Sequence, residues 1–496
     1  MQLSVLPQLE KREESISYMP DPRVKELARL LQGSSIKYCV LHGWDADDSC
    51  LNSDVDITVA PSDLTAFETV LDTNSFGGVL QLRHHQSTGY FFIVRRPTSY
   101  GVALAEFDVG TDYRSDGLVH LSSADLLRNR RRWHGVWIAS EESEFAYLLV
   151  KRICKRRISA RQVNRLHQLE AGLGERSFAV CRQLVGARWA RRIVGWIATS
   201  DRTAFETNLH RLRRALLWRR LTSDPLNPVR YWLPEVVRLQ QRLRYPTGLL
   251  IAVLGPDGAG KTTLIEGLKR ELSGTFRCIE SYRFRPDILG RNLPGPEPHP
   301  HAKSIRSRWQ SILKVLYLCA DYSLGYLINV RSKLVRSDLV IFDRYYDDML
   351  VDPARYRYGG PRWLIKFARH IIPRPDITFI LDASEDQMLA RKTELPREEL
   401  RRQRLAYRQL AAEAPNTFML DASRPATEVV RQASECCLRY LHSRYLKRRR
   451  LWFGTRLSKC DRRKSEGAAR TYLTPGAAME VTAERTRVFH EEDFSQ

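Results

Sequence analysis

The chain has 496 residues, with 80 Lys or Arg against 57 Asp or Glu, and its formal net charge is +23. At roughly 150 residues per domain this length gives room for about three domains. The positive charge favours anionic partners such as nucleotides, acidic membrane surfaces or nucleic acid, and it does not choose among them. The nine cysteines lack a C-x-x-C pair, which excludes an obvious zinc site or disulfide framework and fits a cytoplasmic location.

Two features bear on membranes. The N-terminal stretch has no basic start followed by an apolar core, so no signal peptide is expected. Residues 311–330 come closest to a transmembrane span, but they include Lys314, Asp321 and Asn329. Because a carboxylate inside a bilayer is costly, this segment is predicted to be a buried helix and not a span.

The chain divides into four regions. Residues 1–156 mix strand-like and helical segments, which predicts a small α+β domain. Residues 157–247 have helical periodicity and end in a cluster of prolines, so they read as a helical connector. Residues 248–446 alternate strands and helices, and residues 447–496 lose apolar periodicity after a basic start, which predicts a disordered tail.

Two aspartates lie on one face of the strand-like run at residues 54–59. Strand alternation places the carboxylates of Asp54 and Asp56 about 7 Å apart along that face, where they could share divalent metals. With the earlier Gly43, the run Ser53-Asp54-Val55-Asp56 resembles the nucleotidyltransferase fold.

That resemblance implies a third acid on a neighbouring strand. Asp108 is the candidate for this metal-binding position, with Glu106 on the same face as the alternative. Trp44 stands where the family has a small residue that admits the triphosphate, so its indole could close that pocket. Active nucleotidyl transfer, a non-catalytic use of the fold and a chance pair of surface aspartates all stay open.

Residues 249–263, LLIAVLGPDGAGKTT, form an apolar strand-like run followed by a glycine-rich loop in the register G-x-x-x-x-G-K-[ST], and a helix is predicted directly after it. Backbone N–H groups would hold phosphates at the helix start, Lys261 would neutralise the β and γ oxygens, and the Thr262 hydroxyl would bind Mg²⁺. The predicted nucleotide-binding residues are Gly255, Asp257, Gly258, Ala259, Gly260, Lys261, Thr262 and Thr263.

A second strand-like run, residues 337–342, leads into Asp343-Arg344-Tyr345. At the end of a strand beside the phosphate loop, Asp343 can hold Mg²⁺ and Arg344 can clamp a phosphate with its planar fork. Further strands are predicted at residues 377–382 and 416–421. Strands that alternate with helices predict an α/β fold with a doubly wound parallel sheet.

Over residues 248–440 these motifs resemble the thymidylate kinase family, through GPDGAGKTT, VIFDRY, PDITFILDAS, the LARK segment and the final LDAS. The resemblance implies ATP- and Mg²⁺-dependent phosphoryl transfer to dTMP or a related phosphorylated acceptor. Asp257 would approach the acceptor and Arg344 its phosphate. The resemblance also implies a lid whose arginines stabilise the migrating phosphoryl group, namely Arg391, Arg397, Arg401 and Arg402.

Two segments depart from the family pattern, residues 280–287 and 346–360, and both lie on the acceptor side. Within the second, residues 356–360 resemble thymidylate-kinase-like proteins associated with bacterial polysaccharide gene sets, an association that by itself does not define the chemistry. The expected acceptor is a nucleotide or a phosphosugar. The alternative is a non-catalytic nucleotide-binding switch or assembly protein. Retention of both Asp343 and Arg344 favours an enzyme. Aromatic residues do not interleave with the basic ones, so a nucleic-acid partner is not expected, and the oligomeric state is left open.

Overall fold

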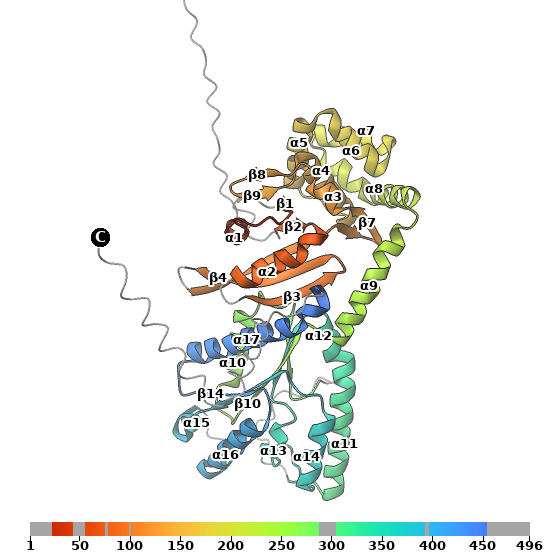
Figure 1. The fold of residues 1–496 in the computed structure, drawn as a ribbon. Coiled ribbons are helices and arrows are strands. Elements are labelled where there is room, and N and C mark those ends of the chain that lie inside the picture. Colours follow the sequence, from red (N-terminus) through yellow and green to blue (C-terminus); the bar gives the residue numbers. More distant parts are fainter. Residues whose placement is uncertain are drawn as a thin grey trace, which may run out of the picture. The chain divides into compact units, whose positions relative to one another are not determined.

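The computed structural model describes residues 22–42, 55–74, 78–98, 101–286, 304–391 and 396–453 (Figure 1). By their contacts, the described residues form two compact units. The first unit contains described residues within 22–74, 85–91 and 105–234, and the second contains those within 78–84, 92–104 and 235–453. Gly43, Trp44 and Asp54 lie outside the described residues.

The first unit is built on a mixed sheet. This sheet has seven strands in the order β3-β4-β5-β2-β1-β9-β8, and parts of β3, β4 and β5 belong by their contacts to the second unit. Strands β6 and β7 form a separate ribbon. β2 is antiparallel to β1 and parallel to β5, and β1 is parallel to β9. The strands are β1 (Tyr38–His42), β2 (Asp56–Val59), β3 (Val79–Gln86), β4 (Gly89–Thr98), β5 (Gly101–Gly110), β6 (Tyr113–Ser115), β7 (Leu118–Leu121), β8 (Arg131–Trp133) and β9 (Val136–Ile138).

Helices of the first unit share one core with its strands. Phe145, Leu166 and Phe205 are buried in the same cluster as Cys39 of β1. Helix starts are fixed by local caps, such as the Ser159 hydroxyl that accepts a hydrogen bond from the backbone of Gln162. The helices are α1 (Pro22–Leu30), η2 (Pro61–Asp63), α2 (Leu64–Asn74), α3 (Ser123–Leu127), α4 (Glu141–Lys155), α5 (Ala160–Leu173), α6 (Glu175–Val185), α7 (Ala187–Ala198), α8 (Arg202–Ser223) and α9 (Asn227–Arg244), the last of which continues into the second unit.

The second unit contains a five-stranded sheet in the order β11-β12-β10-β13-β14, with every pair parallel. The central strand β10 is buried at all six positions, as expected where helices cover both faces. Alternate residues enter two different cores, Ile251 on one face and Ala252 on the other. The strands are β10 (Leu249–Leu254), β11 (Ile279–Arg283), β12 (Leu339–Asp343), β13 (Ile377–Asp382) and β14 (Thr417–Asp421). This α/β architecture agrees with the predicted parallel sheet.

Helices cover both faces of this sheet. Leu268 of α10 and Val429 of α17 pack in one core, while Val315 of α11 and Ile365 of α14 pack in the other. The helices are α10 (Lys261–Glu271), α11 (Arg308–Gly325), the π-helical turn η3 (Tyr326–Val330), α12 (Arg331–Val335), α13 (Asp348–Val351), α14 (Arg362–Ile371), α15 (Glu385–Arg391), α16 (Arg397–Glu413) and α17 (Ala426–Phe453).

Helix α17 continues past the predicted domain end at residue 446. The guanidinium of Arg448 donates to the Pro246 carbonyl at 2.7 Å, and the Phe453 ring stacks on Phe92 with centroids 6.4 Å apart. Residues 447–453 are therefore helical and make tertiary contacts, so the prediction of a disordered tail is wrong for them. Their basic composition gave no sign of these contacts. The rest of the predicted tail lies outside the described residues.

The segment predicted as a buried helix is buried on one face only. By length and composition, residues 308–335 form the one helix in the described part of the chain that could cross a membrane, and a third of its most apolar window is buried in the unit. Its carboxylate, Asp321, is 6% exposed and lies 3.5 Å from the Arg285 guanidinium. The other face of the helix carries exposed apolar side chains.

Candidate active site

The glycine-rich loop joins β10 to α10 as the motif predicts. Gly260 precedes α10 with φ +93°, a backbone conformation that favours glycine. A Cβ at Gly255 would lie 2.8 Å from the Leu381 carbonyl oxygen, so the loop can pass this close to β13 only without a side chain. The loop therefore places backbone N–H groups at a helix N-terminus, the arrangement that binds phosphates.

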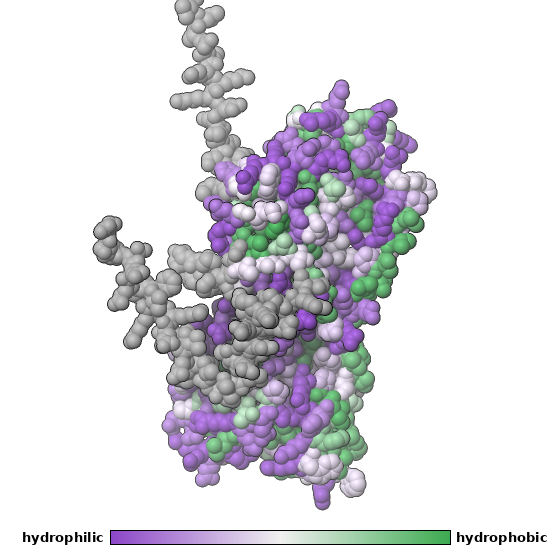
Figure 2. Space-filling view, in the orientation of Figure 1, coloured by the Kyte–Doolittle hydropathy of each residue, from purple (hydrophilic) through white to green (hydrophobic). Residues whose placement is uncertain are grey.

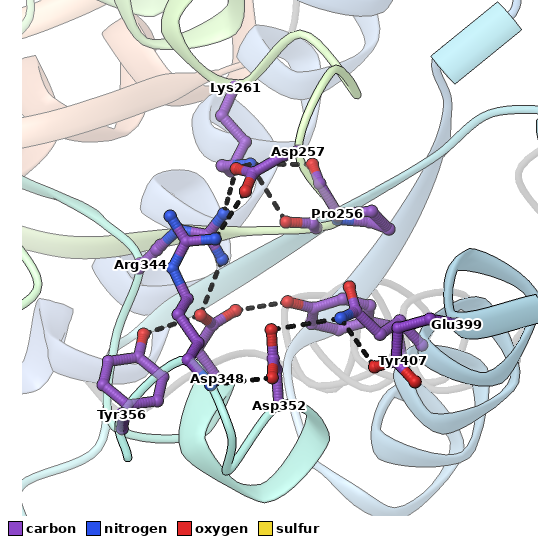
Figure 3. A network of polar contacts seen from close by, with 12 residues as sticks. Pro256, Asp257, Lys261, Arg344, Asp348, Asp352, Tyr356, Glu399 and Tyr407 are labelled. Carbon is purple, nitrogen blue, oxygen red and sulfur yellow. Dashed lines mark hydrogen bonds and ion pairs between the residues drawn. The ribbon is translucent and has the colours of Figure 1, made fainter. Parts of the chain in front are cut away.

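The Lys261 ammonium folds back onto this loop. It donates hydrogen bonds to the carbonyl oxygens of Gly255 at 3.0 Å and Pro256 at 2.8 Å, and it lies 3.7 Å from an oxygen of Asp257 (Figure 3). Burial, with the guanidinium of Arg344 nearby, lowers the pKa of Lys261 from 10.5 to about 7, because the surrounding carboxylates offset the loss of water only in part. The ammonium is thus poised to accept an anionic partner.

Asp343 ends β12 beside the central strand, where it pairs in register with Val253 of β10. Its Oδ1 atom is buried and has no hydrogen-bond partner among the described residues. A buried carboxylate oxygen without a partner fits a cation or its bound water. Thr262 is exposed in the first turn of α10, so its hydroxyl is available to a ligand.

Arg344 follows with φ +70°, an uncommon backbone conformation for a residue with a side chain. Its guanidinium is held between two carboxylates, at 2.5 Å from Asp257 and 2.6 Å from Asp348. A second guanidinium, that of Arg355, donates to the other oxygen of Asp257 at 2.5 Å. Two arginines therefore converge on one anionic group of the phosphate loop.

Asp348 fixes the orientation of Arg344. It is fully buried and accepts hydrogen bonds from the Tyr356 hydroxyl, at 2.6 Å, and from the Tyr407 hydroxyl. Burial raises the pKa of this carboxyl, but Arg344 and the two hydroxyls outweigh burial and hold the pKa below its ordinary value. Sequence reasoning missed Asp348, Arg355, Tyr356 and Tyr407 as site residues. For Asp348, Arg355 and Tyr356 the only signal was their position in residues 346–360, a segment that departs from the family pattern, and Tyr407 lies outside that segment.

The predicted lid arginines do not converge on one point in this structure. Arg391 lies nearest the phosphate loop, with a nitrogen 3.4 Å from the Gly258 carbonyl oxygen. Arg397 pairs with Asp386, Arg402 pairs with Glu399, and Arg401 is exposed. Two arginines that were not predicted, Arg404 and Arg408, bind Asp382 at the end of β13, each at 2.7 Å.

A second polar site lies in the first unit. Asp56 of β2 and Asp108 of β5 are register partners on neighbouring strands, as the predicted metal patch requires. Both line a cavity of about 280 Å³ with Tyr147 and Lys151 of α4. The Lys151 ammonium forms an ion pair with Asp56, which sequence reasoning did not find. Whether Asp54 joins this patch stays a prediction, because it lies outside the described residues.

The fold and the loop of the second unit are those of a P-loop protein, and comparison with known sequences places this unit among the nucleotide kinases. A family model described as thymidylate kinase matches residues 253–433. Probable thymidylate kinase 1 of Saccharolobus solfataricus is 31% identical over 199 residues, which cover 37% of this chain and 94% of that protein. Thymidylate kinase of Leifsonia xyli subsp. xyli is 32% identical over 195 residues, covering 37% of this chain and 90% of that protein. The solved thymidylate kinase of Ehrlichia chaffeensis aligns with 38% of this chain at 20% identity and a TM-score of 0.28. Through its C-terminal region, the chain belongs to the thymidylate kinase family.

Proposed function

We propose that the second unit transfers the γ-phosphoryl group of ATP, with Mg²⁺, to an acceptor that already carries a phosphate, such as dTMP, a related nucleoside monophosphate or a phosphosugar. The observation that carries this proposal is the convergence of Arg344 and Arg355 on Asp257. Two guanidinium groups aimed at one point beside the loop form a site for a doubly charged phosphate, with the Asp257 carboxylate as the internal counter-ion.

In this proposal the site residues have the following roles in the transfer. A phosphate oxygen of the acceptor attacks the γ-phosphorus, the bond to the β–γ bridging oxygen breaks, and ADP leaves. Lys261 neutralises the β and γ oxygens, and Arg391, at the end of α15, reaches the same loop. Asp343 and Thr262 would hold Mg²⁺, which supplies positive charge to the phosphate oxygens. Arg344 and Arg355 orient the acceptor in line with the leaving group.

A coupled assay of ADP formation tests this function. ATP is supplied with dTMP, other nucleoside monophosphates and phosphosugars, and each acceptor is paired with its dephosphorylated form. Turnover is expected with at least one phosphorylated acceptor and not with its dephosphorylated partner. No turnover with any acceptor, while a fluorescent ATP analogue still binds, would contradict the proposal.

ATP binding at pH 8 is expected to take up a proton through Lys261. Burial holds the pKa of the free ammonium at about 7, so the group is mostly neutral at pH 8, and the added phosphate charge raises that pKa again. Calorimetry in two buffers of different ionisation enthalpy should report an uptake approaching one proton. Lys261→Arg serves as the control, because arginine stays protonated in both states and should abolish the uptake. Equal uptake in both proteins would place the titrating group elsewhere.

We also propose that Asp54, Asp56 and Asp108 of the first unit form a divalent-metal patch of the nucleotidyltransferase type. The register pairing of Asp56 with Asp108 at the cavity wall supports this proposal. Because the Lys151 ammonium already occupies the Asp56 carboxylate, an incoming metal ion must compete with an internal cation.

Lys151→Met is therefore expected to strengthen Mn²⁺ binding to the full chain roughly tenfold or more, since the competing charge is lost while the aliphatic packing is kept. Asp343→Asn is included in every protein to weaken the kinase cation site. Mn²⁺ titration followed by electron paramagnetic resonance gives the affinity, and adding Asp56→Asn should remove this class of site. If Lys151→Met leaves the Mn²⁺ affinity unchanged, the paired aspartates are not a metal site.

A further inference from the structure

Two helices of the second unit present large apolar side chains to solvent. Trp309 on α11 is 77% exposed and Trp363 on α14 is 66% exposed. Figure 2 shows hydrophobic surface along the edge formed by α11. The exposed apolar face consists of Trp309, Leu313, Leu316, Leu324, Leu327, Ile328, Trp363, Phe367 and Ile371.

The spacing of these residues shows that the apolar face is separate from the core. Trp309, Leu313 and Leu316 are four and three positions apart, so they lie along one side of α11. The opposite sides of both helices are already buried in the unit, through Val315 of α11 and Ile365 of α14. An apolar surface of this extent that the fold does not cover marks an interaction site.

The charge around this face selects the kind of partner. Residues 304–336 and 362–371 contain nine lysines or arginines and a single acidic residue, Asp321, which is buried. Two of the nine, Lys333 and Arg369, pair with carboxylates from outside these ranges. A second copy would bring the same positive charge to the interface and repel. An anionic lipid surface supplies the opposite charge together with an apolar interior. Exposed tryptophans beside cationic side chains are typical of helices that lie in that interface.

We propose that the apolar face docks the kinase unit onto an anionic lipid bilayer, with α11 and α14 lying in the plane of the interface. The apolar side chains enter the boundary between headgroups and acyl chains. The exposed cations Arg308, Arg362 and Lys366 contact the lipid phosphates. Docking, and not spanning, follows because Asp321 lies on the buried side of the same helix, within the unit.

Co-sedimentation of the full chain with vesicles tests this docking. Binding is expected to vesicles of phosphatidylcholine mixed with phosphatidylglycerol, to weaken as salt is added, and to be much weaker with phosphatidylcholine alone. The double variant Trp309→Ser with Leu313→Ser should lose most binding. Arg362→Gln with Lys366→Gln should weaken binding about fivefold per charge removed. Trp218→Ser on α8 is the matched control, because this tryptophan is 70% exposed in the first unit and outside the apolar face.

The proposal is overturned if binding ignores lipid charge and salt, or if the Trp309 and Leu313 variant binds as the wild type does. Sedimentation equilibrium without lipid tests the competing explanation, that the apolar face is a dimer interface. A stable dimer that this variant dissociates would assign the apolar face to a second copy. Thermal melts and ATP binding of each variant, both unchanged from the wild type, are expected to show that the substitutions leave the fold intact.

Discussion

Lys261→Ala is expected to lower kcat by more than about 10²-fold, because the lysine neutralises charge that builds on the transferring phosphoryl group. The fold should remain intact. Burial depresses the pKa of this ammonium, so the folded protein disfavours its charge and loses little when the ammonium is removed. Steady-state turnover and a thermal melt of the purified variant measure the two effects separately.

Lys269→Ala is the matched control for this variant. Lys269 lies on the same helix, α10, and pairs with Glu266 at 2.8 Å at the surface. Its loss should leave turnover unchanged, since surface pairs of this kind contribute little. Equal turnover in the Lys261→Ala variant and the wild type would remove the phosphate loop from the mechanism.

The substitution Arg344→Lys is expected to have the second large effect, on the binding of the acceptor. It should raise the acceptor KM by roughly 10- to 100-fold, as expected for the loss of charge-assisted hydrogen bonds worth about 1.5–3 kcal/mol. A lysine keeps the charge but cannot bridge two partners with a planar fork, as the arginine bridges Asp257 and Asp348. The ATP KM should change far less, because Lys261 and the loop backbone hold the nucleotide.

Arg424→Lys is the control for the second prediction, because Arg424 pairs with Glu428 at the surface after β14. Steady-state kinetics of the wild type and of the two variants, with the acceptor and ATP varied in turn, give the KM for each substrate. Equal changes in the acceptor KM and the ATP KM of the Arg344→Lys variant would show that Arg344 does not face the acceptor.

Local patterns predicted much of the kinase fold. The apolar run at residues 249–254 and the run at 377–382 are strands with those bounds, because fully buried parallel strands have continuous apolar sequence. The phosphate loop, Asp343 and Arg344 lie where their motifs place them. Arg355 and Tyr407 were missed because they reach the site through contacts 98 and 59 residues away in sequence, to Asp257 and Asp348, which no local spacing encodes.

The first unit was harder to predict for the same reason. Strand alternation pointed to Asp56, the resemblance to a nucleotidyltransferase pointed to Asp108, and the sheet register brings the two together. The strands at residues 131–133 and 136–138 are too short to show a pattern. Lys151 reaches Asp56 from a helix 95 residues later in the chain. Composition also gave no sign that the helices at residues 160–223 share a core with Cys39 and Leu41 of β1.

Phosphorus NMR of the reaction products tests the central claim most directly. With ATP, Mg²⁺ and the acceptor that supports ADP formation, the account predicts a new phosphoanhydride in which the former γ-phosphoryl group is the terminal phosphate of the acceptor. The signal should be absent with Lys261→Ala and with the dephosphorylated acceptor. Release of inorganic phosphate alone, or no consumption of bound ATP, would contradict phosphoryl transfer to a phosphate acceptor.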